Sequence, residues 1–162
     1  MRVQVAGVLA ALQVMTTPVP VMGYNGKFPG KGNYRQWKKA AALYSRAVRA
    51  EQDGRKDEAM HLYELAIDVY PFDADFYLNL GLLYENEMRD AAGAEGMYKK
   101  GLALEPDHPE LQLAWASLLC DKGEISESIT VWRRAQAKLE QHRESEDLRR
   151  PPAPLRPAKF HI

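Results

Sequence analysis

The sequence has a single cysteine, Cys120, among 162 residues, and its four histidines are scattered with no two at the spacing of metal ligands. One cysteine excludes a disulfide within the chain and a zinc site built from several cysteines. We interpret Cys120 as a small apolar packing residue, because it directly follows Leu118 and Leu119 on an amphipathic stretch. The sequence therefore predicts neither a metal site nor a disulfide framework.

Motifs of catalytic chemistry are also missing. The carboxylates are spread along positions expected to face solvent, and no nucleophile follows the pattern of a strained turn. The glycine-lysine pairs near residue 30 do not form a phosphate-binding loop, because Gly32 rather than Ser or Thr follows Lys31 and no apolar strand precedes them. We expect a protein that is not an enzyme and that binds no cofactor.

Acidic residues are absent from the first fifty positions, although the whole chain has 22 acidic and 22 basic residues. Those fifty positions hold eight basic residues and carry +8, so the remainder, with 14 basic and 22 acidic side chains, carries −8. The net charge of zero therefore hides two parts of opposite sign, and the partners of each part need not be alike.

No long hydrophobic run is present. Residues 3–26 contain no charge, but the uninterrupted apolar run within them has about 13 residues, short of the roughly 20 that span a bilayer, and Pro18 and Pro20 would break an extension. The stretch fits a secretory signal or short anchor, an organelle-targeting segment, or an apolar arm that packs on a partner, and the sequence does not separate these interpretations. Residues 3–22 are where we expect any membrane contact.

Glycine and proline divide the chain into three parts. Residues 1–33 combine the apolar segment with a glycine-rich basic linker, residues 34–150 carry helical periodicity, and residues 151–162 form a proline-rich tail expected to be extended. The apolar spacing in the central part predicts six helices, at residues 34–52, 56–69, 74–86, 90–104, 109–121 and 125 to about 149.

One pattern of apolar and small residues recurs through the helical part. Its marks in the middle copy are Tyr77, Leu80, Gly81, Tyr84, Ala94, Tyr98, Gly101 and Pro106. Gly81 is matched by Ala47, 34 residues earlier, and by Ala116, 35 residues later. A period of this length is typical of a helical hairpin that is repeated and stacked, so the chain should contain three copies of one hairpin.

These residues resemble the tetratricopeptide repeat family over about residues 40–142. The resemblance implies an all-α fold, a right-handed superhelical stack of three helix-turn-helix repeats (an α-solenoid) with extended N- and C-terminal tails. Three copies are about the minimum for an independent stack. The first copy departs from the pattern with Arg46 at a leucine position, and the third with Trp115 there and Glu140 in place of the final proline, so the last helix can run on.

The family binds other proteins in a concave groove lined by the first helix of each repeat. Alignment of the three copies places these residues in that groove: Tyr44, Val48, Glu51, Leu78, Asn79, Leu82, Glu85, Leu113 and Asp121. Such a groove is apolar along its middle and acidic at its edges, which suits an apolar helix or a basic segment. Of the residues with which family members clamp the C-terminal carboxylate of heat-shock chaperones, only Asn79 is kept, so we expect no carboxylate clamp.

The main functional hypothesis is a non-enzymatic protein-protein interaction scaffold, an assembly factor or accessory subunit of a larger, membrane-associated or organellar complex. The alternative is a membrane-tethered adaptor whose basic N-terminal segment binds anionic lipid. Nucleic acid is not an expected partner, because the predicted groove is acidic. A membrane-associated or organellar location is favoured over a plain cytoplasmic one, and the compartment, the partner and the oligomeric state are left open.

Overall fold

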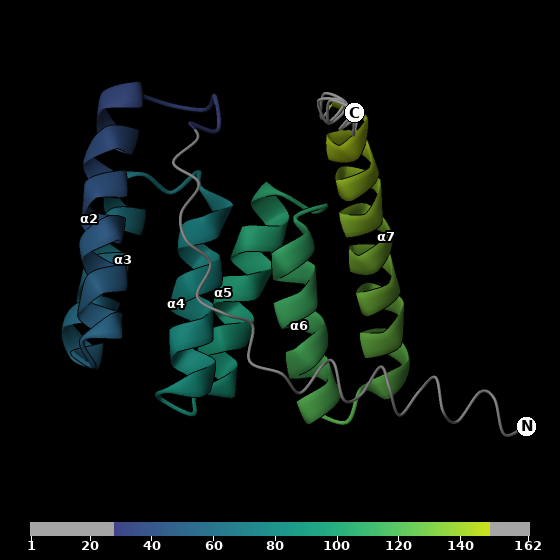
Figure 1. The fold of residues 1–162 in the computed structure, drawn as a ribbon. Coiled ribbons are helices and arrows are strands. Elements are labelled where there is room, and N and C mark those ends of the chain that lie inside the picture. Colours follow the sequence, from purple (N-terminus) through teal and green to yellow (C-terminus); the bar gives the residue numbers. More distant parts are fainter. Residues whose placement is uncertain (1–27, 150–162) are drawn as a thin grey trace, which may run out of the picture.

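The computed structural model describes residues 28–149, which form six α-helices and no strand. The helices are α2 (Tyr34–Gln52), α3 (Lys56–Val69), α4 (Ala74–Asn86), α5 (Ala91–Leu104), α6 (Pro109–Asp121) and α7 (Ile125–Arg149). They pair in chain order as three antiparallel hairpins, which stand side by side with α2 and α3 at one end and α7 at the other (Figure 1). The predicted apolar segment and the proline-rich tail, residues 3–26 and 151–162, lie outside the described residues.

The helix bounds predicted from the sequence are confirmed, with one shift at α5. This helix begins at Ala91 because Asp90 is its N-cap, and the Asp90 carboxylate accepts a hydrogen bond from the backbone N–H of Gly93 at 2.9 Å. Gly54 and Gly123 make the turns inside the first and third hairpins, with φ of +76° and +82°. Glycine adopts this left-handed conformation without steric cost, so both turns follow directly from the sequence.

Small residues let the two helices of a hairpin approach each other closely. A Cβ atom added to Gly81 of α4 would lie 2.7 Å from Cδ1 of Tyr98 on α5, too close for any real contact, so this position needs glycine. Ala47 and Ala116 hold the matching positions of α2 and α6, and both are fully buried. The predicted packing of a small residue against the neighbouring helix is confirmed.

The second and third hairpins bury apolar side chains of their first helix against the hairpin before them. Phe76, Leu80 and Leu83 of α4 belong to the core cluster that α2 and α3 form. Leu111 and Leu118 of α6 belong to a second cluster with residues of α4 and α5. This continuous stack confirms the predicted all-α solenoid of three repeats.

The last helix, α7, is the longest, with 25 residues. It runs past Glu140, the position at which the repeat pattern has a helix-ending proline, as the sequence predicted. The hydroxyl of Ser128 fixes its start by donating a buried hydrogen bond to the carbonyl of Ala116 on α6 at 2.7 Å. Among residues 28–149, none of the helices combines the length and the apolar character that crossing a membrane requires.

Candidate functional site

The nine predicted groove residues come from the first helix of each hairpin, and these three helices run in the same direction (Figure 1). We call the nine residues the first-helix face. Its buried members are Tyr44, Leu78, Asn79 and Leu82. Its half-buried members are Val48, Glu51, Glu85 and Leu113, and Asp121 is exposed. A partner that approaches this face therefore meets side chains that are either aliphatic or acidic.

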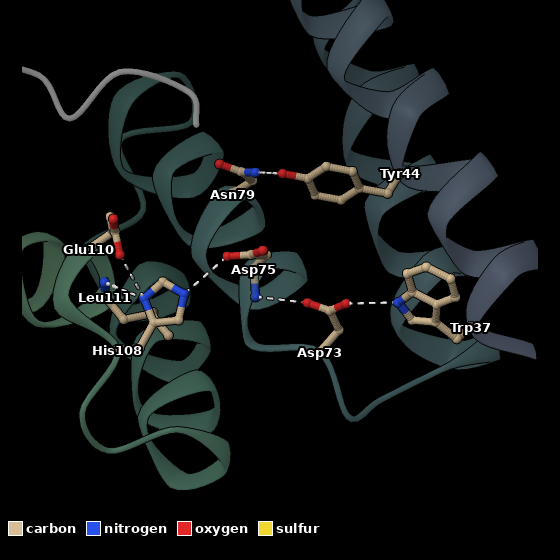
Figure 2. A network of polar contacts seen from close by, with 8 residues as sticks. All are labelled: Trp37, Tyr44, Asp73, Asp75, Asn79, His108, Glu110 and Leu111. Carbon is tan, nitrogen blue, oxygen red and sulfur yellow. Dashed lines mark hydrogen bonds and ion pairs between the residues drawn. The ribbon is translucent and has the colours of Figure 1, made fainter. Parts of the chain in front are cut away.

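Tyr44 joins the first two repeats. Its ring stacks on Phe76 of α4, with centroids 5.1 Å apart, and meets Tyr63 of α3 edge-on at 5.4 Å. Its hydroxyl accepts a hydrogen bond from Nδ2 of Asn79 on α4 (Figure 2). Aromatic contacts of this kind add to the free energy gained from burial alone. Tyr44 is therefore a core residue that sets the position of α4 relative to α2.

Asn79 has one polar atom without a partner. The residue is 1% exposed, and its Oδ1 atom is buried with no hydrogen-bond partner among the described residues. Figure 2 shows this oxygen pointing away from Tyr44, which engages the other end of the amide. A buried acceptor left unpaired costs about 1–3 kcal/mol, so this atom lowers the stability of the junction between the first two repeats.

In each of the first two repeats, a tyrosine and a glutamate form a hydrogen bond that the sequence analysis did not predict. The hydroxyl of Tyr63 on α3 donates a hydrogen bond to the carboxylate of Glu51 on α2 at 2.8 Å. The hydroxyl of Tyr98 on α5 donates to the carboxylate of Glu85 on α4 at 2.7 Å. The signal was present, because a glutamate precedes the repeat tyrosine by 12 residues in the first copy and 13 in the second.

Burial raises the pKa of both carboxyl groups above the ordinary value. For Glu51, the loss of hydration outweighs the tyrosine hydrogen bond, and Glu87 adds electrostatic repulsion. For Glu85, burial again outweighs the hydrogen bond, and Asp121 adds repulsion. Neither glutamate takes part in any ion pair among the described residues. Both carboxylates are therefore partly desolvated and have no cationic partner among residues 28–149.

Glu51, Glu85 and Asp121 lie at the carboxyl ends of the three first helices, and we call them the acidic rim. The carboxyl end of a helix carries partial negative charge from its free carbonyl groups, which adds to the charge of the side chains. Because α2, α4 and α6 run in the same direction, these ends share one edge of the stack (Figure 1). The acidic rim is thus arranged to attract a positively charged group.

The third repeat breaks the tyrosine-glutamate pattern. Trp132 stands at the tyrosine position and Cys120 at the glutamate position, and the buried Nε1 atom of Trp132 has no hydrogen-bond partner among the described residues. Cys120 is a free thiol that is half-buried. The acidic rim therefore depends on the exposed Asp121 in this repeat, next to Cys120.

His108 joins the second and third repeats, a role that the sequence analysis did not predict (Figure 2). Its Nε2 atom lies 3.0 Å from Oδ1 of Asp75 on α4, and its Nδ1 atom accepts a hydrogen bond from the backbone N–H of Leu111 at 3.3 Å. Nδ1 also lies 3.3 Å from the carboxylate of Glu110. Burial alone would lower the pKa of His108, but the hydrogen bond to Asp75 and the surrounding negative charges outweigh it and raise the pKa.

In the part of the chain that the structure describes, no group of His, Cys, Asp and Glu side chains is arranged to hold a metal ion. His108, Asp75 and Glu110 are close together, but the imidazole is engaged as the N-cap of α6 and in the contact with Asp75.

No family model matches the chain. The probable biofilm formation methyltransferase WspC of Pseudomonas putida is 31% identical over 107 residues, which are 66% of this chain and 25% of that protein. The match therefore spans about a quarter of the length of this curated relative.

Solved structures with a similar fold come from proteins of different kinds. The Yersinia enterocolitica type III secretion chaperone SycD, solved with a peptide of the translocator YopD, has a TM-score of 0.61 at 24% identity over 72% of this chain and 88% of that chain. The first tetratricopeptide repeat domain of Spaghetti (RPAP3), bound to an HSP90 peptide, has a TM-score of 0.59 at 18% identity over 70% and 95%. The likeness shows the fold, which is the tetratricopeptide repeat fold that the family resemblance implied.

Proposed function

We propose that this chain, a stack of three tetratricopeptide-type hairpins, is a non-enzymatic protein-protein interaction scaffold that binds an apolar or basic segment of a partner on its first-helix face. The acidic rim carries the proposal, because Glu51 and Glu85 are half-buried carboxylates with no cation among the described residues to neutralise them. Holding such groups in the folded state costs stability, since burial disfavours their charged form. A lysine or arginine of a partner would offset that cost.

The rest of the first-helix face suits the body of such a segment. Val48 and Leu113 are half-buried and offer aliphatic surface on α2 and α6. A segment with apolar residues along its length and a basic residue near the acidic rim would contact both the aliphatic surface and the acidic rim, in the manner of a helix or extended peptide bound in a groove.

The solved structures of similar fold support a protein as the partner. SycD was solved with a peptide of YopD, and the first domain of Spaghetti was solved with an HSP90 peptide, so stacks of this fold do hold peptides. The methyltransferase activity in the name of WspC is not carried to this chain, because three quarters of that protein lies outside the match. We also propose that no carboxylate clamp forms here, since Tyr44 and Val48 replace two of the polar clamp residues.

The proposal extends to the setting of the scaffold. We place it as an assembly factor or accessory subunit of a larger complex, at a membrane or in an organelle, without cofactor or nucleic acid. The support comes from the sequence, in which an uncharged apolar segment and a basic stretch precede the acidic remainder of the chain. Such a chain can contact an apolar surface through one part and a basic partner through the other.

The test is a comparison of two doubly substituted chains in affinity purification from the source cells. Glu51→Gln with Glu85→Gln removes both charges but keeps an oxygen that can accept the tyrosine hydrogen bonds, so the stack should stay folded. Glu127→Gln with Glu144→Gln removes two exposed charges from α7 and is the matched control. Quantitative mass spectrometry should find partners that are reduced about tenfold or more with the first variant and unchanged with the second.

Direct binding gives a second readout with defined probes. Two synthetic amphipathic helices that differ only in lysine or glutamate at one end should differ in affinity for the wild-type chain, measured by fluorescence anisotropy. The lysine peptide should lose its advantage with Glu51→Gln and Glu85→Gln. Equal binding of the two peptides, together with identical partners for all three chains, would reject the acidic rim as a recognition site.

A further inference from the structure

Helix α2 lies at one end of the stack (Figure 1), and it carries a group of exposed basic side chains. We call its five basic residues the basic end face: Arg35, Lys38, Lys39, Arg46 and Arg49. All five side chains are exposed, and none takes part in an ion pair among the described residues. At 3.6 residues per turn, they fall within about 100° of the circumference of one helix. The five positive charges therefore lie on one side of α2.

The repeat pattern explains why this side is open. Leu80 and Leu83 of α4 are buried against the preceding hairpin, at 2% and 1% exposed. The residues 34 positions earlier on α2 are Arg46 and Arg49. No hairpin precedes α2 within the described residues, so the positions that bury leucine elsewhere are exposed and basic here. The departure of Arg46 from the family pattern thus marks a surface that faces away from the stack.

The field of the basic end face is not cancelled by acids on the same helix. The first turn of α2 has no acidic residue, and the sole acid of the helix, Glu51, lies in the last turn. Glu51 accepts its hydrogen bond from Tyr63 of α3, on the side that packs within the hairpin. A single helix of 19 residues, about 28 Å long, therefore presents one row of unpaired cations.

The surroundings of this row favour one kind of anionic partner. Tyr34 begins α2, is 58% exposed and lies one helical turn before Lys38 on the same side. Exposed tyrosine beside lysine and arginine is typical of the headgroup region of a membrane. Immediately upstream in the sequence, residues 3–26 carry no charge and are rich in aliphatic side chains. Stable attachment to a bilayer generally needs two weak signals, such as one apolar anchor and one polybasic patch.

We infer that the basic end face binds the surface of a membrane containing anionic lipids. This role is separate from peptide binding on the first-helix face, because the two surfaces lie on different sides of α2 and have opposite charge. Each lysine or arginine near an anionic bilayer strengthens attachment, so five on one face give binding that depends strongly on salt and on lipid charge. The acidic rim is then free to hold a basic segment of a partner protein.

The test is flotation of the purified full-length chain with vesicles of phosphatidylcholine alone or with 30% phosphatidylserine, at low and at physiological salt. Arg46→Glu with Arg49→Glu reverses two charges of the basic end face. Arg133→Glu with Arg134→Glu makes the same change in net charge at exposed positions of α7 that form no ion pair within the described part of the chain, and it is the matched control. Arg46→Lys with Arg49→Lys keeps the charge. Circular dichroism confirms that each variant is folded, and Lys38→Glu with Lys39→Glu is a second, independent reversal on the same face.

We expect the wild-type chain to float with anionic vesicles and to be released as salt rises. The two reversals on α2 should weaken partitioning at least about tenfold, while the lysine variant and the α7 control stay within about twofold of wild type. If the α7 control loses as much vesicle partitioning as the α2 reversals do, the effect depends on net charge alone. The assignment of membrane binding to the basic end face would then be wrong. Flotation on neutral vesicles that is insensitive to the α2 reversals would also overturn it, as would binding of polyglutamate or duplex DNA through Arg46 and Arg49 without binding of vesicles.

Discussion

The hydroxyl of Tyr98 donates a hydrogen bond to the carboxylate of Glu85 at 2.7 Å, across the two helices of the middle hairpin. The first hairpin repeats this contact with Tyr63 and Glu51. In both hairpins the tyrosine ring fills the space between helices, while its hydroxyl holds an acidic side chain at the edge of the first-helix face. One residue type therefore links the packing of the repeat to the charge of its surface.

Removal of the Tyr98 hydroxyl tests this link. With Tyr98→Phe, the ring still packs against Gly81, but Glu85 loses the hydrogen bond that offsets part of its desolvation, so its pKa should rise further. We expect the free energy of unfolding to fall by about 1–2 kcal/mol. Urea denaturation measures the stability, and titration followed by carboxyl NMR measures the pKa. Tyr84→Phe is the control, because the Tyr84 hydroxyl makes only a 3.4 Å contact with exposed Glu64 and its loss should matter little.

Neutralising the acidic rim should stabilise the stack at neutral pH. Burial raises the pKa of Glu51 and Glu85 above 4.5, so the folded chain holds their protons more tightly than the unfolded chain does. That contribution to stability is fully present below pH 4.5 and is lost as the pH rises through the raised pKa values. Glu51→Gln with Glu85→Gln should therefore gain about 1 kcal/mol at pH 7 and less at pH 4.

Thermal unfolding of the wild-type and doubly substituted chains at the two pH values measures this gain. If the gain in stability over the wild-type chain is the same at both pH values, or if the variant is less stable than wild type at pH 7, burial of the two charged carboxylates does not destabilise the fold. Combined with loss of peptide binding, a gain in stability at pH 7 would indicate that the acidic rim is retained for recognition at the expense of stability.

The fold was predictable because its determinants are local or recur at a nearly constant spacing of 34 or 35 residues. Helix ends follow from residues such as Asp90 and Gly123, whose conformational preferences act within a few positions. The hairpin follows from Gly81, because a small residue repeated at a constant spacing is required wherever two helices approach closely. These signals need no knowledge of distant contacts, so the sequence alone contains them.

The site was less predictable, because exposure and polar contacts depend on atoms from different repeats. Leu82 was expected on the inner surface and is 4% exposed, since it belongs to the cluster with residues of α5 and α6. His108 contacts Asp75 across 33 residues, and Asn79 contacts Tyr44 across 35. Alignment of the repeats identifies which helices face each other, but not which polar atoms meet.

The burial of Leu82 has a direct consequence for mutagenesis. Leu82→Glu places a charge in a closely packed cluster, so we expect a loss of about 3 kcal/mol or more, enough to unfold a small stack. Val48→Glu, at a half-buried position of the same face, should leave the chain folded. Thermal unfolding followed by circular dichroism compares them. If Leu82→Glu is as stable as Val48→Glu, the packing of α4 against its neighbours is looser than described.

His108 should make the junction between the second and third repeats sensitive to pH. Its pKa is raised above 6.5 by Asp75, Glu110 and Glu105, which together outweigh burial. A histidine with a raised folded-state pKa adds stability that is fully present below pH 6.5 and is lost as the pH rises through the folded-state value. Unfolding free energies measured between pH 5.5 and 9 should decline over that window.

His108→Gln should remove this decline, and His61→Gln, at an exposed position of α3, should leave it unchanged. In the neutral form, the Nε2–H group donates to Asp75 while Nδ1 caps α6 by accepting from Leu111. The glutamine variant can keep one of these contacts at most, so it should also be less stable than wild type at pH 6. Parallel pH profiles for wild type and His108→Gln would assign the pH dependence to other groups.

Arg46 and Arg49 should also prevent the stack from growing by association. They stand at the positions where Leu80 and Leu83 pack against the preceding hairpin, so Arg46→Leu with Arg49→Leu gives α2 the apolar positions of an internal repeat, although no hairpin packs on them within the described residues. An exposed apolar face of this kind favours self-association, and we expect sedimentation velocity to show a concentration-dependent shift to larger species than wild type forms. Arg133→Leu with Arg134→Leu is the control, because α7 offers no repeat position for a neighbour at those residues. If both double variants sediment as wild type does, the leucine positions alone do not create a stacking surface, and the basic end face has no role in keeping that end of the stack open.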